Sequence, residues 1–479
     1  MNVLEHWIGG LSTPSIDGGT RTGVAPATGG EGATVTQGTP ADVDRAVLAA
    51  HAARHGWRHI ASMERGRILG RVATGIRNAI DELTELEVAD TGKPIELARA
   101  EIQGAADYFE FYAALVHLPA GDVLDVRPDL HVYTLREPLG VIGVITPWNL
   151  PINQAARACA PALAAGNTVV AKPAETTSQT TIALARIASE AGLPDGVFNV
   201  VLGRGAVVGT AIVEHPLVRK VAFTGSVPTG QQIGRIAADR ILPLTLELGG
   251  KSANIVFADA DLAFAATEAA RAFATNAGQV CSSGTRLLVQ RGIEEEFTTL
   301  VVEATQAYRP GETLGPMITR SQFETVQEYF EVAAAEGAVL RTGGSVSTDP
   351  SLKGGFFVEP TVYSGVDNRM RIAREEVFGP VLVVIPFDTE EEAIALANDS
   401  DFGLVGGVFS ADISRAFRVA EAFEAGQVYI NSWSTQSVQM PFGGHKASGY
   451  GREKGIEALA HYSHLKSVSV RITPGRWAR

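Results

Sequence analysis

The chain has little cysteine and no long apolar run. Cys159 and Cys281 are the only cysteines among its 479 residues. With no Cys-x-x-Cys motif and no Cys/His cluster, neither disulfide bonds nor a metal site are expected. No stretch of about 20 uninterrupted apolar residues is present to span a membrane, and no basic segment precedes an apolar core at the start, as a secretory signal would require. These absences predict a reduced, cytoplasmic protein that does not enter a membrane.

Basic residues are also fewer than acidic ones. The chain has 40 Lys and Arg against 53 Asp and Glu, giving a formal net charge of −13 at pH 7. This balance offers no basic surface for nucleic acid or for an anionic membrane. The composition, with 45% hydrophobic and 7% aromatic residues, is that of an ordinary globular protein. The length favours two or three domains.

The first quarter of the chain is predicted to be helical. Apolar residues at helical spacing predict helices over 41–55, 62–91 and 95–116. Thr39 and Pro40 suit the cap and the first turn of the first of these helices. In Thr91-Gly92-Lys93-Pro94, the glycine and the proline end one helix and begin the next. Residues 120–138 then alternate as an exposed strand pair, which is more typical of a projecting arm than of a core.

From residue 140, short apolar strands alternate with helices. The predicted strands are 141–146, 168–171, 197–201 and 220–223, and the helices between them are 155–165, 177–191 and 205–215. A second series follows Cys281, over 287–290, 293–308, 326–336, 381–387 and 414–424. Such alternation predicts an α/β protein with two doubly wound, Rossmann-like domains built on parallel sheets, plus a small β arm.

Cys281 lies in a stretch of small residues, Asn276-Ala277-Gly278-Gln279-Val280-Cys281-Ser282-Ser283. A thiol in such surroundings indicates an accessible nucleophile, although a buried structural cysteine is the alternative. Glu247 begins another open stretch, Glu247-Leu248-Gly249-Gly250-Lys251. A thiol and a base drawn from separate loops suit covalent catalysis. Cys159, by contrast, is expected to pack inside a helix.

Three predicted strands end in unusual residues. These ends are Pro147-Trp148-Asn149, Lys172-Pro173-Ala174-Glu175 and Phe223-Thr224-Gly225-Ser226. Any one of them can be explained as a simple loop. Because ligands bind at the carboxyl ends of strands in an α/β sheet, three together predict a ligand site.

Taken with these motifs, the chain resembles the aldehyde dehydrogenase superfamily of nicotinamide-dependent enzymes nearly from end to end. The matching stretches are Trp7-Ile8-Gly9-Gly10, the three strand ends, Glu247-Leu248-Gly249-Gly250-Lys251, Gly278-Gln279-Val280-Cys281, Glu376-Val377-Phe378-Gly379-Pro380 and Pro441-Phe442-Gly443-Gly444-His445-Lys446-Ala447-Ser448-Gly449-Tyr450-Gly451-Arg452-Glu453. The resemblance implies an NAD-binding domain over 1–118 and 139–247 and a catalytic domain over 248–450. It also implies an oligomerisation arm over 119–138 and 451–479, and a homodimer or homotetramer.

The resemblance implies that Cys281 attacks the aldehyde carbon to form a thiohemiacetal. The Asn149 side-chain amide and the Cys281 backbone N–H would stabilise the oxyanion, each such donor being worth roughly 3–4 kcal/mol. Transfer of hydride to the nicotinamide leaves a thioester, and Glu247 activates the water that hydrolyses it. Two alternatives are a CoA-acylating semialdehyde dehydrogenase, against which Glu247 argues, and a catalytically idle structural relative.

The resemblance also implies a binding site for NAD. Lys172 and Glu175 would bind the adenosine ribose, and Ser226, at the first turn of a helix opened by Gly225, would bind the pyrophosphate. The implied cofactor-binding residues are Trp148, Lys172, Glu175, Gly225, Ser226, Gly249, Glu376 and Phe378. A carboxylate at Glu175 would repel a 2′-phosphate, so NAD is favoured, with NADP possible.

Arg157 is the departure that bears on the substrate. An aromatic residue is common at this position in the family, whereas succinate-semialdehyde dehydrogenases have an arginine there that binds the substrate carboxylate. Their second arginine is replaced here by Thr275, and a salt bridge is the alternative role for Arg157. The inferred pocket residues are Leu150, Asn153, Arg157, Thr275, Val280, Ser282, Gln436 and Phe442. Their polarity predicts a small polar, acidic or hydroxylated aromatic aldehyde.

Overall fold

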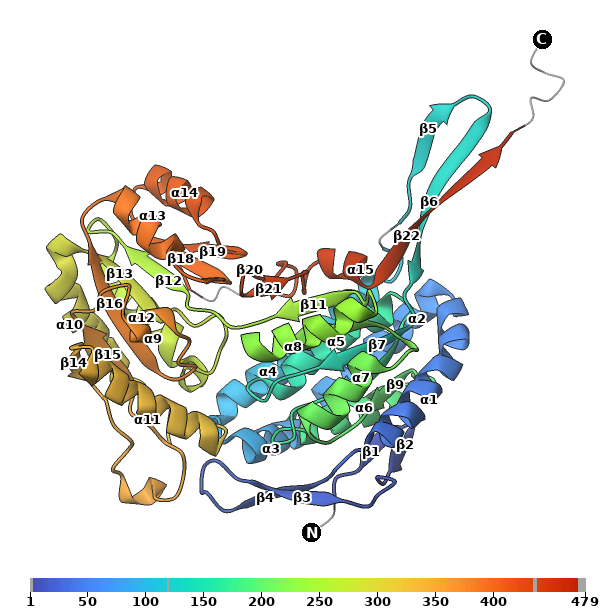
Figure 1. The fold of residues 1–479 in the computed structure, drawn as a ribbon, viewed down its shortest axis with the longest axis horizontal. Helices are drawn as coiled ribbons and strands as arrows, with labels where there is room; N and C mark the ends of the chain where they lie inside the picture. The colour runs from blue at the N-terminus through green and yellow to red at the C-terminus, as the bar shows by residue number, and fades with distance from the viewer. Residues whose placement is uncertain (1–2, 119, 434–436, 473–479) are drawn as a thin grey trace.

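The computed structural model describes residues 3–118, 120–433 and 437–472. Two α/β bodies lie side by side, and a narrow β arm projects from them (Figure 1). Both large sheets are mainly parallel, as predicted from the alternation of strands and helices. Within the described residues, no helix is both long enough and apolar enough to cross a membrane.

The first body is built on an eight-stranded sheet in the order β2-β1-β9-β8-β7-β10-β11-β21. Its strands are β1 (His6–Ile8), β2 (Leu11–Thr13), β7 (Val141–Ile145), β8 (Thr168–Lys172), β9 (Phe198–Val200), β10 (Val218–Thr224), β11 (Leu244–Glu247) and β21 (Gly449–Tyr450). Strands β7 to β11 run parallel, with β1 and β21 antiparallel at their two sides. The associated helices are α5 (Pro151–Ala164), α6 (Gln179–Glu190), α7 (Thr210–Glu214, preceded by a π-helical turn at Gly205–Gly209) and α8 (Val227–Asp239).

The helical first quarter packs against this sheet. Its helices are α1 (Pro40–His59), α2 (Ser62–Asn78), α3 (Ile80–Thr91) and α4 (Ile95–Ala114). The predicted cap is present, since the Thr39 side chain accepts a hydrogen bond from the backbone N–H of Asp42. The predicted single helix over 62–91 is wrong: the chain bends at Ala79, and α3 runs beside α6. There Glu87 accepts a hydrogen bond from Thr180 at 2.7 Å, a long-range contact that leaves no local signal in the sequence.

The second body is built on a seven-stranded sheet in the order β14-β15-β16-β13-β12-β18-β19. Its strands are β12 (Ala253–Val256), β13 (Arg286–Gln290), β14 (Val339–Thr342), β15 (Thr361–Ser364), β16 (Val381–Phe387), β18 (Val405–Phe409) and β19 (Gln427–Ile430). Its helices are α9 (Leu262–Ala274), α10 (Glu294–Thr305), α11 (Arg320–Ala335), α12 (Arg371–Arg374), α13 (Glu390–Asn398) and α14 (Ile413–Ala422). The predicted series omitted β12, although this strand pairs with β13 and β18 inside the sheet. Helix α11 begins six residues before the predicted 326, where Thr319 caps it by accepting from Gln322 N–H.

The chain passes between the two bodies more than once. It leaves the first sheet at Glu247, enters the second at Ala253, and returns as β21, which pairs with β11. Short strands β17 (Phe402–Gly403) and β20 (His445–Lys446) pair on the second body, and the hairpin β3 (Thr20–Val24) and β4 (Glu31–Thr36) lies near the N-terminus. The division into NAD-binding domain, catalytic domain and arm stays a prediction.

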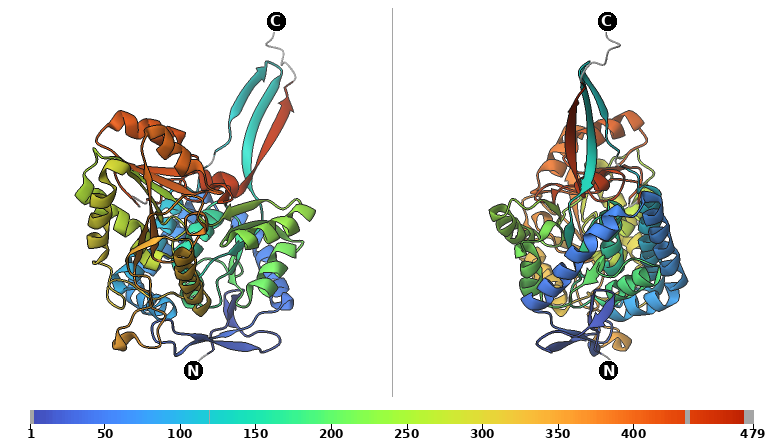
Figure 2. Two further views of the ribbon diagram at one scale, coloured as in Figure 1. Left: turned by 60° about the vertical axis from the view of Figure 1, so that its left-hand side comes forward. Right: turned by 90° about the vertical axis from the view of Figure 1, so that its right-hand side faces the viewer.

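The arm has three antiparallel strands, β5 (Val123–Arg127), β6 (Leu130–Pro138) and β22 (Ser463–Arg471). Figure 2 shows it standing clear of both bodies. Strands β6 and β22 pair along their length, with His131 opposite Val470 and Tyr133 opposite Val468. Helix α15 (Glu457–His461) precedes β22 and packs against α5 in the first body.

Candidate active site

The carboxyl ends of β7, β10 and β11 meet the second body at a cavity of about 280 Å³. Its lining includes all three predicted catalytic residues and six of the eight predicted cofactor residues. The lining residues are Pro147, Trp148, Asn149, Gln154, Thr224, Gly225, Ser226, Glu247, Leu248, Gly249, Cys281, Gln322, Thr325, Glu376, Val377 and Phe378. Residues from distant parts of the sequence thus share one enclosed space.

An irregular turn brings Cys281 to this cavity. Helix α9 ends at Ala274, and Asn276, Ala277 and Gly278 then adopt left-handed φ angles of 52°, 53° and 71°. A Cβ atom at Gly278 would lie 2.1 Å from the carbonyl oxygen of Gly379, so only glycine fits there. Backbone strain of this kind persists only where the surrounding structure holds it, and it is frequent at active sites.

Cys281 is partly buried and packs against an apolar cluster that contains Leu404, Trp433 and Phe442. Burial raises the pKa of its thiol to about 11, and the positive charge of Arg157 offsets part of that rise. The thiol is therefore protonated at neutral pH in this structure. A nucleophilic thiolate would need a nearby base to accept its proton.

Glu247, at the end of β11, is the carboxylate in the same cavity. Both of its oxygens are buried and have no hydrogen-bond partner among the described residues. Burial raises its pKa well above the ordinary value, and the nearby Glu453 carboxylate raises it further. An unpaired buried carboxyl group has unfilled capacity to bind a proton or a water molecule.

Asn149 follows β7 and is almost completely buried. Its side-chain nitrogen donates a hydrogen bond to the Gln279 carbonyl at 2.8 Å, which ties it to the turn before Cys281. An amide nitrogen carries two hydrogens, so one donor remains for a ligand. The Asn149 side chain is thus available as a hydrogen-bond donor beside the thiol.

The opposite part of the cavity has features that suit a dinucleotide. Helix α8 begins at Val227, directly after Ser226, so Ser226 precedes the helix and does not lie in its first turn as predicted. The unpaired N–H groups at this helix end favour a pyrophosphate. Trp148 and Phe378 form an edge-to-face pair with ring centroids 5.4 Å apart, which offers aromatic surface for a planar ring.

Glu376 lies beside this aromatic pair, and its Oε1 accepts a hydrogen bond from Gly250 N–H at 3.0 Å. A Cβ atom at Gly249 would lie 2.2 Å from the Glu376 carboxylate, so a larger residue there would displace that side chain. Burial raises the pKa of Glu376 to about 7. A carboxylate here can accept hydrogen bonds from ribose hydroxyls, and the cavity fits the nicotinamide half of NAD.

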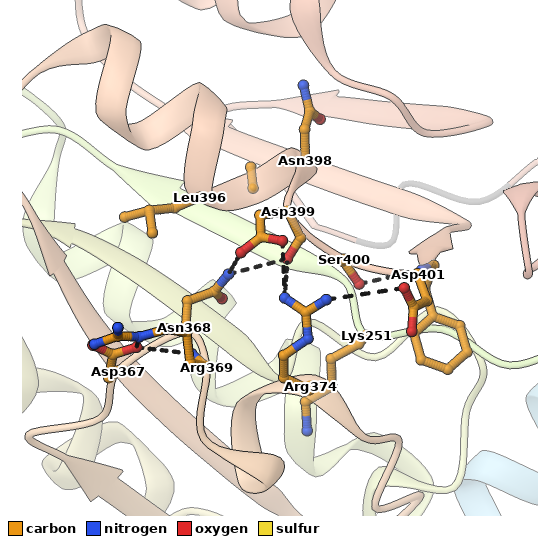
Figure 3. Close-up of polar contacts among 12 residues, drawn as sticks. Lys251, Asp367, Asn368, Arg369, Arg374, Leu396, Asn398, Asp399, Ser400 and Asp401 are labelled. Atoms are coloured by element: carbon orange, nitrogen blue, oxygen red, sulfur yellow. Dashed lines mark hydrogen bonds and ion pairs between the residues drawn. The ribbon is translucent and has the colours of Figure 1, made fainter.

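A polar network behind the cavity connects the segments that carry Gly249 and Glu376. The buried Arg286 donates to the Lys251 carbonyl at 3.0 Å and to Asn368 Oδ1 at 2.9 Å. Asn368 and Arg374 both donate to Asp399, at 3.0 and 2.9 Å (Figure 3). The network therefore fixes the Gly-Gly segment relative to the chain that leads into Glu376.

Lys172, the last residue of β8, and Glu175, which follows the strand, are the predicted ribose ligands, and neither lines this cavity. Lys172 is buried, which lowers its pKa to about 8. Arg21 of β3 forms an ion pair with Glu175 at 3.2 Å. The preference for NAD over NADP at this end stays a prediction.

A second cavity, of about 660 Å³, lies between α4, the first turn of α5 and the segment 437–454. Asn153, one of the predicted pocket residues, lines it. The full lining is Ala100, Gly104, Asp107, Tyr108, Glu110, Phe111, Asn153, Ser437, Val438, Gln439 and Lys454. Lys454, which lines this cavity, is one of the two positive charges that offset the rise in the pKa of the Cys281 thiol.

Arg157 forms a buried ion pair with Glu453. Its guanidinium also lies 5.3 Å from the centre of the Phe442 ring, and Lys454 Nζ lies 5.2 Å from the same centre. The salt bridge that the sequence left as an alternative is therefore the arrangement found, and the carboxylate clamp has no support here.

The remaining pocket predictions fall in different places. Thr275 donates to the Arg271 carbonyl at 2.8 Å, at the end of α9. Leu150, Val280 and Ser282 line neither cavity, and Gln436 lies outside the described residues.

The sequence prediction missed two kinds of residue. Gln322 holds Phe378, which has a left-handed φ of 54°, by donating to the Val377 and Phe378 carbonyls. No local pattern marks this glutamine. Glu453 and Lys454 were also missed as site residues, although adjacent charges after Gly451 are unusual enough in a glycine-rich segment to be noticed.

Comparison with known proteins gives one consistent result. The family model "Aldehyde dehydrogenase family" matches residues 15–468. A betaine aldehyde dehydrogenase of Cereibacter sphaeroides is 45% identical, over 98% of both chains. A mutant indole-3-acetaldehyde dehydrogenase of P. syringae, solved with NAD+, is 39% identical with a TM-score of 0.96, covering 98% of this chain and 97% of that one. The betaine aldehyde dehydrogenase of Staphylococcus aureus, also solved with NAD+, is 39% identical with a TM-score of 0.95, covering 99% and 96%.

We expect alkylation of Cys281 by iodoacetamide, without cofactor, to speed up about tenfold per pH unit from pH 7 to 10. The reason is that thiolate is the reactive form and the thiol pKa is about 11. Mass spectrometry of labelled peptides measures the rate. Cys281→Ala is the control, because it leaves only Cys159, whose burial should prevent labelling in the folded protein. A labelling rate that levels off by pH 8 would contradict the expectation.

Proposed function

The chain belongs to the aldehyde dehydrogenase family and oxidises an aldehyde with NAD, and we propose that Cys281, Glu247 and Asn149 carry the reaction. The observation behind this proposal is their convergence: a thiol, a carboxyl group and an amide from three separate segments line one cavity. Nucleophile, base and oxyanion donor are the three groups that covalent oxidation of a carbonyl needs.

In the first step, Glu247 takes the thiol proton, and Cys281 Sγ attacks the aldehyde carbon to give a thiohemiacetal. The raised pKa of Glu247 makes its carboxylate a stronger base than an exposed one, which favours this transfer. Asn149 Nδ2 donates to the oxygen as negative charge develops there. Glu376 and Phe378 would hold the nicotinamide half of NAD in this cavity, and the bound cofactor would supply the acceptor for the hydride that leaves the substrate carbon, so that a thioester on Cys281 remains.

Before the second step, Glu247 releases the thiol proton to solvent, and it then accepts a proton from water as the water attacks the thioester carbon. The carbon–sulfur bond breaks, the carboxylic acid leaves, and the Cys281 thiolate regains a proton from Glu247. A buried carboxyl group without hydrogen-bond partners suits this role because it can hold a water molecule. The presence of Glu247 favours hydrolysis over transfer of the acyl group to coenzyme A.

The Glu247→Gln variant should impair both steps. We expect rapid mixing with aldehyde and NAD to give at most about one NADH per chain, formed more slowly than in the wild type because the base for the thiol is lost. Steady-state turnover should then be slowed roughly 10²–10⁴-fold because the base for water is lost. Cys281→Ala should form no NADH, and Cys159→Ala, a change at a buried helix position, should stay within about twofold of the wild type. Normal steady turnover by Glu247→Gln would disprove its role as the hydrolytic base.

We further propose that the substrate is a small polar aldehyde, with an acidic or hydroxyl group favoured over a cationic one. Recognition of a quaternary ammonium commonly uses open aromatic faces. Here two cations, Arg157 and Lys454, already lie over the Phe442 ring near the nucleophile. The acidic groups of the larger cavity, Asp107 and Glu110, are offset by the Arg77 ion pairs.

Lys454 is expected to set this preference. The wild type should have a kcat/KM for succinic semialdehyde at least tenfold above that for betaine aldehyde. Lys454→Met should lower kcat/KM for succinic semialdehyde about 10-fold or more, as loss of a charge-assisted contact does. The kcat/KM for butanal, which has no charged group, should change less than threefold. Lys446→Met, an exposed lysine on β20, is the matched control. A preference for betaine aldehyde in the wild type would reverse the proposal.

We propose that the protein assembles as a homodimer or homotetramer through its arm, in the cytoplasm. Strands β5 and β22 are the edges of the three-stranded arm and present unpaired backbone groups. Apolar side chains are exposed along both edges, with Val126 58% and Leu465 58% accessible. A second chain would cover this surface, and a reducing compartment would keep the Cys281 thiol free.

Charge placed on both arm edges should separate the subunits. For Val126→Lys with Leu465→Lys, we expect sedimentation velocity to show a species of lower mass than the wild type, because lysine on an edge strand opposes pairing. The control is Ile241→Lys, at a site that is 91% accessible and lies outside the three arm strands. A wild type that sediments as a monomer would refute the proposal.

A further inference from the structure

The segment Thr91-Gly92-Lys93-Pro94 does more than separate two helices. Gly92 ends α3 with a left-handed φ of 68°, and a Cβ atom there would lie 2.6 Å from Pro316. This tight passage turns Lys93 inward, and only 2% of the residue is accessible. A lysine this deeply buried needs close partners to offset the loss of its hydration.

The Lys93 ammonium group uses its three donors on three acceptor atoms of two residues. It contacts both Glu101 oxygens, at 2.7 and 2.6 Å, and the Asn149 backbone carbonyl at 3.1 Å. Glu87 lies 3.8 Å away and adds a second carboxylate. The ion pair with Glu101 explains why the charge is tolerated, whereas the bond to Asn149 connects it to the active site.

The Asn149 carbonyl is held from a second direction as well. Asn276 Nδ2 donates to it at 3.1 Å and to the Gln279 carbonyl at 3.3 Å. Gln279 in turn accepts from the Asn149 side chain. One buried group of hydrogen bonds therefore joins Lys93, the Asn149 peptide and the strained turn before Cys281.

We propose that Lys93 is a positioning residue for the reaction: by holding the Asn149 carbonyl, it fixes the direction of the Asn149 side-chain amide toward the oxyanion. Lys93 does not line the cavity that contains Cys281, so it acts only through Asn149. The inference rests on the proposed function of Asn149. Its physical basis is that an oxyanion donor stabilises charge only when it is already aimed at the place where the charge develops.

A double-mutant cycle tests this role. Loss of Asn149, in Asn149→Ala, should slow the NADH burst about 10²–10³-fold. We expect Lys93→Met to slow it about tenfold or more in the wild type, with the KM for NAD unchanged, but less than threefold in the Asn149→Ala background. Such non-additivity is what a residue acting through Asn149 produces, and a merely structural role would not.

Two further variants guard against loss of folding. Lys93→Met leaves Glu101 buried without its cation, so Lys93→Met/Glu101→Gln removes both charges and should show the same slow burst. Lys220→Met removes another buried lysine, which donates to Thr245 at 2.7 Å, and should leave the burst within about twofold. Melting temperatures of all variants show whether stability and rate change together.

Equal slowing by Lys93→Met in both backgrounds, or no slowing in either, would overturn the positioning role while leaving the proposed function standing. If Asn149→Ala itself has a normal burst, the oxyanion role fails and the inference fails with it.

Discussion

Burial of the Glu247 carboxyl group between the two α/β bodies is the constraint on which the site depends. The end of β11 places this group away from water, where its oxygens have no partner among the described residues. Its pKa rises because the charged form is poorly solvated there. Burial in the same region between the two bodies also raises the pKa of the Cys281 thiol.

The two bodies are held in a fixed relation where the chain crosses between them. The segment after Glu247 is bound on the far side by Arg286, through the Lys251 carbonyl. The return segment pairs with β11 as β21 and brings Glu453 against Arg157. Because each crossing carries a residue of the site, a shift of either body would change the distances between reacting groups. This explains why strained backbone is concentrated here, at Asn276, Ala277 and Phe378.

The role of Arg157 could not be read from its position in the sequence. The resemblance suggested a substrate ligand, but a buried guanidinium must be neutralised, and Glu453 lies within contact distance in the fold. The neutralising partner is almost three hundred residues later in the chain, so no window of sequence contains both. The same holds for Lys93, whose neighbours in the sequence indicate only a helix boundary, while its hydrogen bond to Asn149 depends on how α4 packs on α5.

Patterns of short range already specified many of the helices, the central strands β7 to β10 of the first sheet, and the motifs that name the family. Apolar periodicity, Thr39 as a cap and the glycines around Glu247 and Cys281 express preferences of the local backbone. The single helix predicted over 62–91 failed because the bend at Ala79 serves a contact with α6. The tertiary structure alone determines which charges pair, how the pKa values of buried groups shift, and what shape the two cavities have. They depend on desolvation and on distances between residues remote in sequence, which exist only once the two bodies have come together.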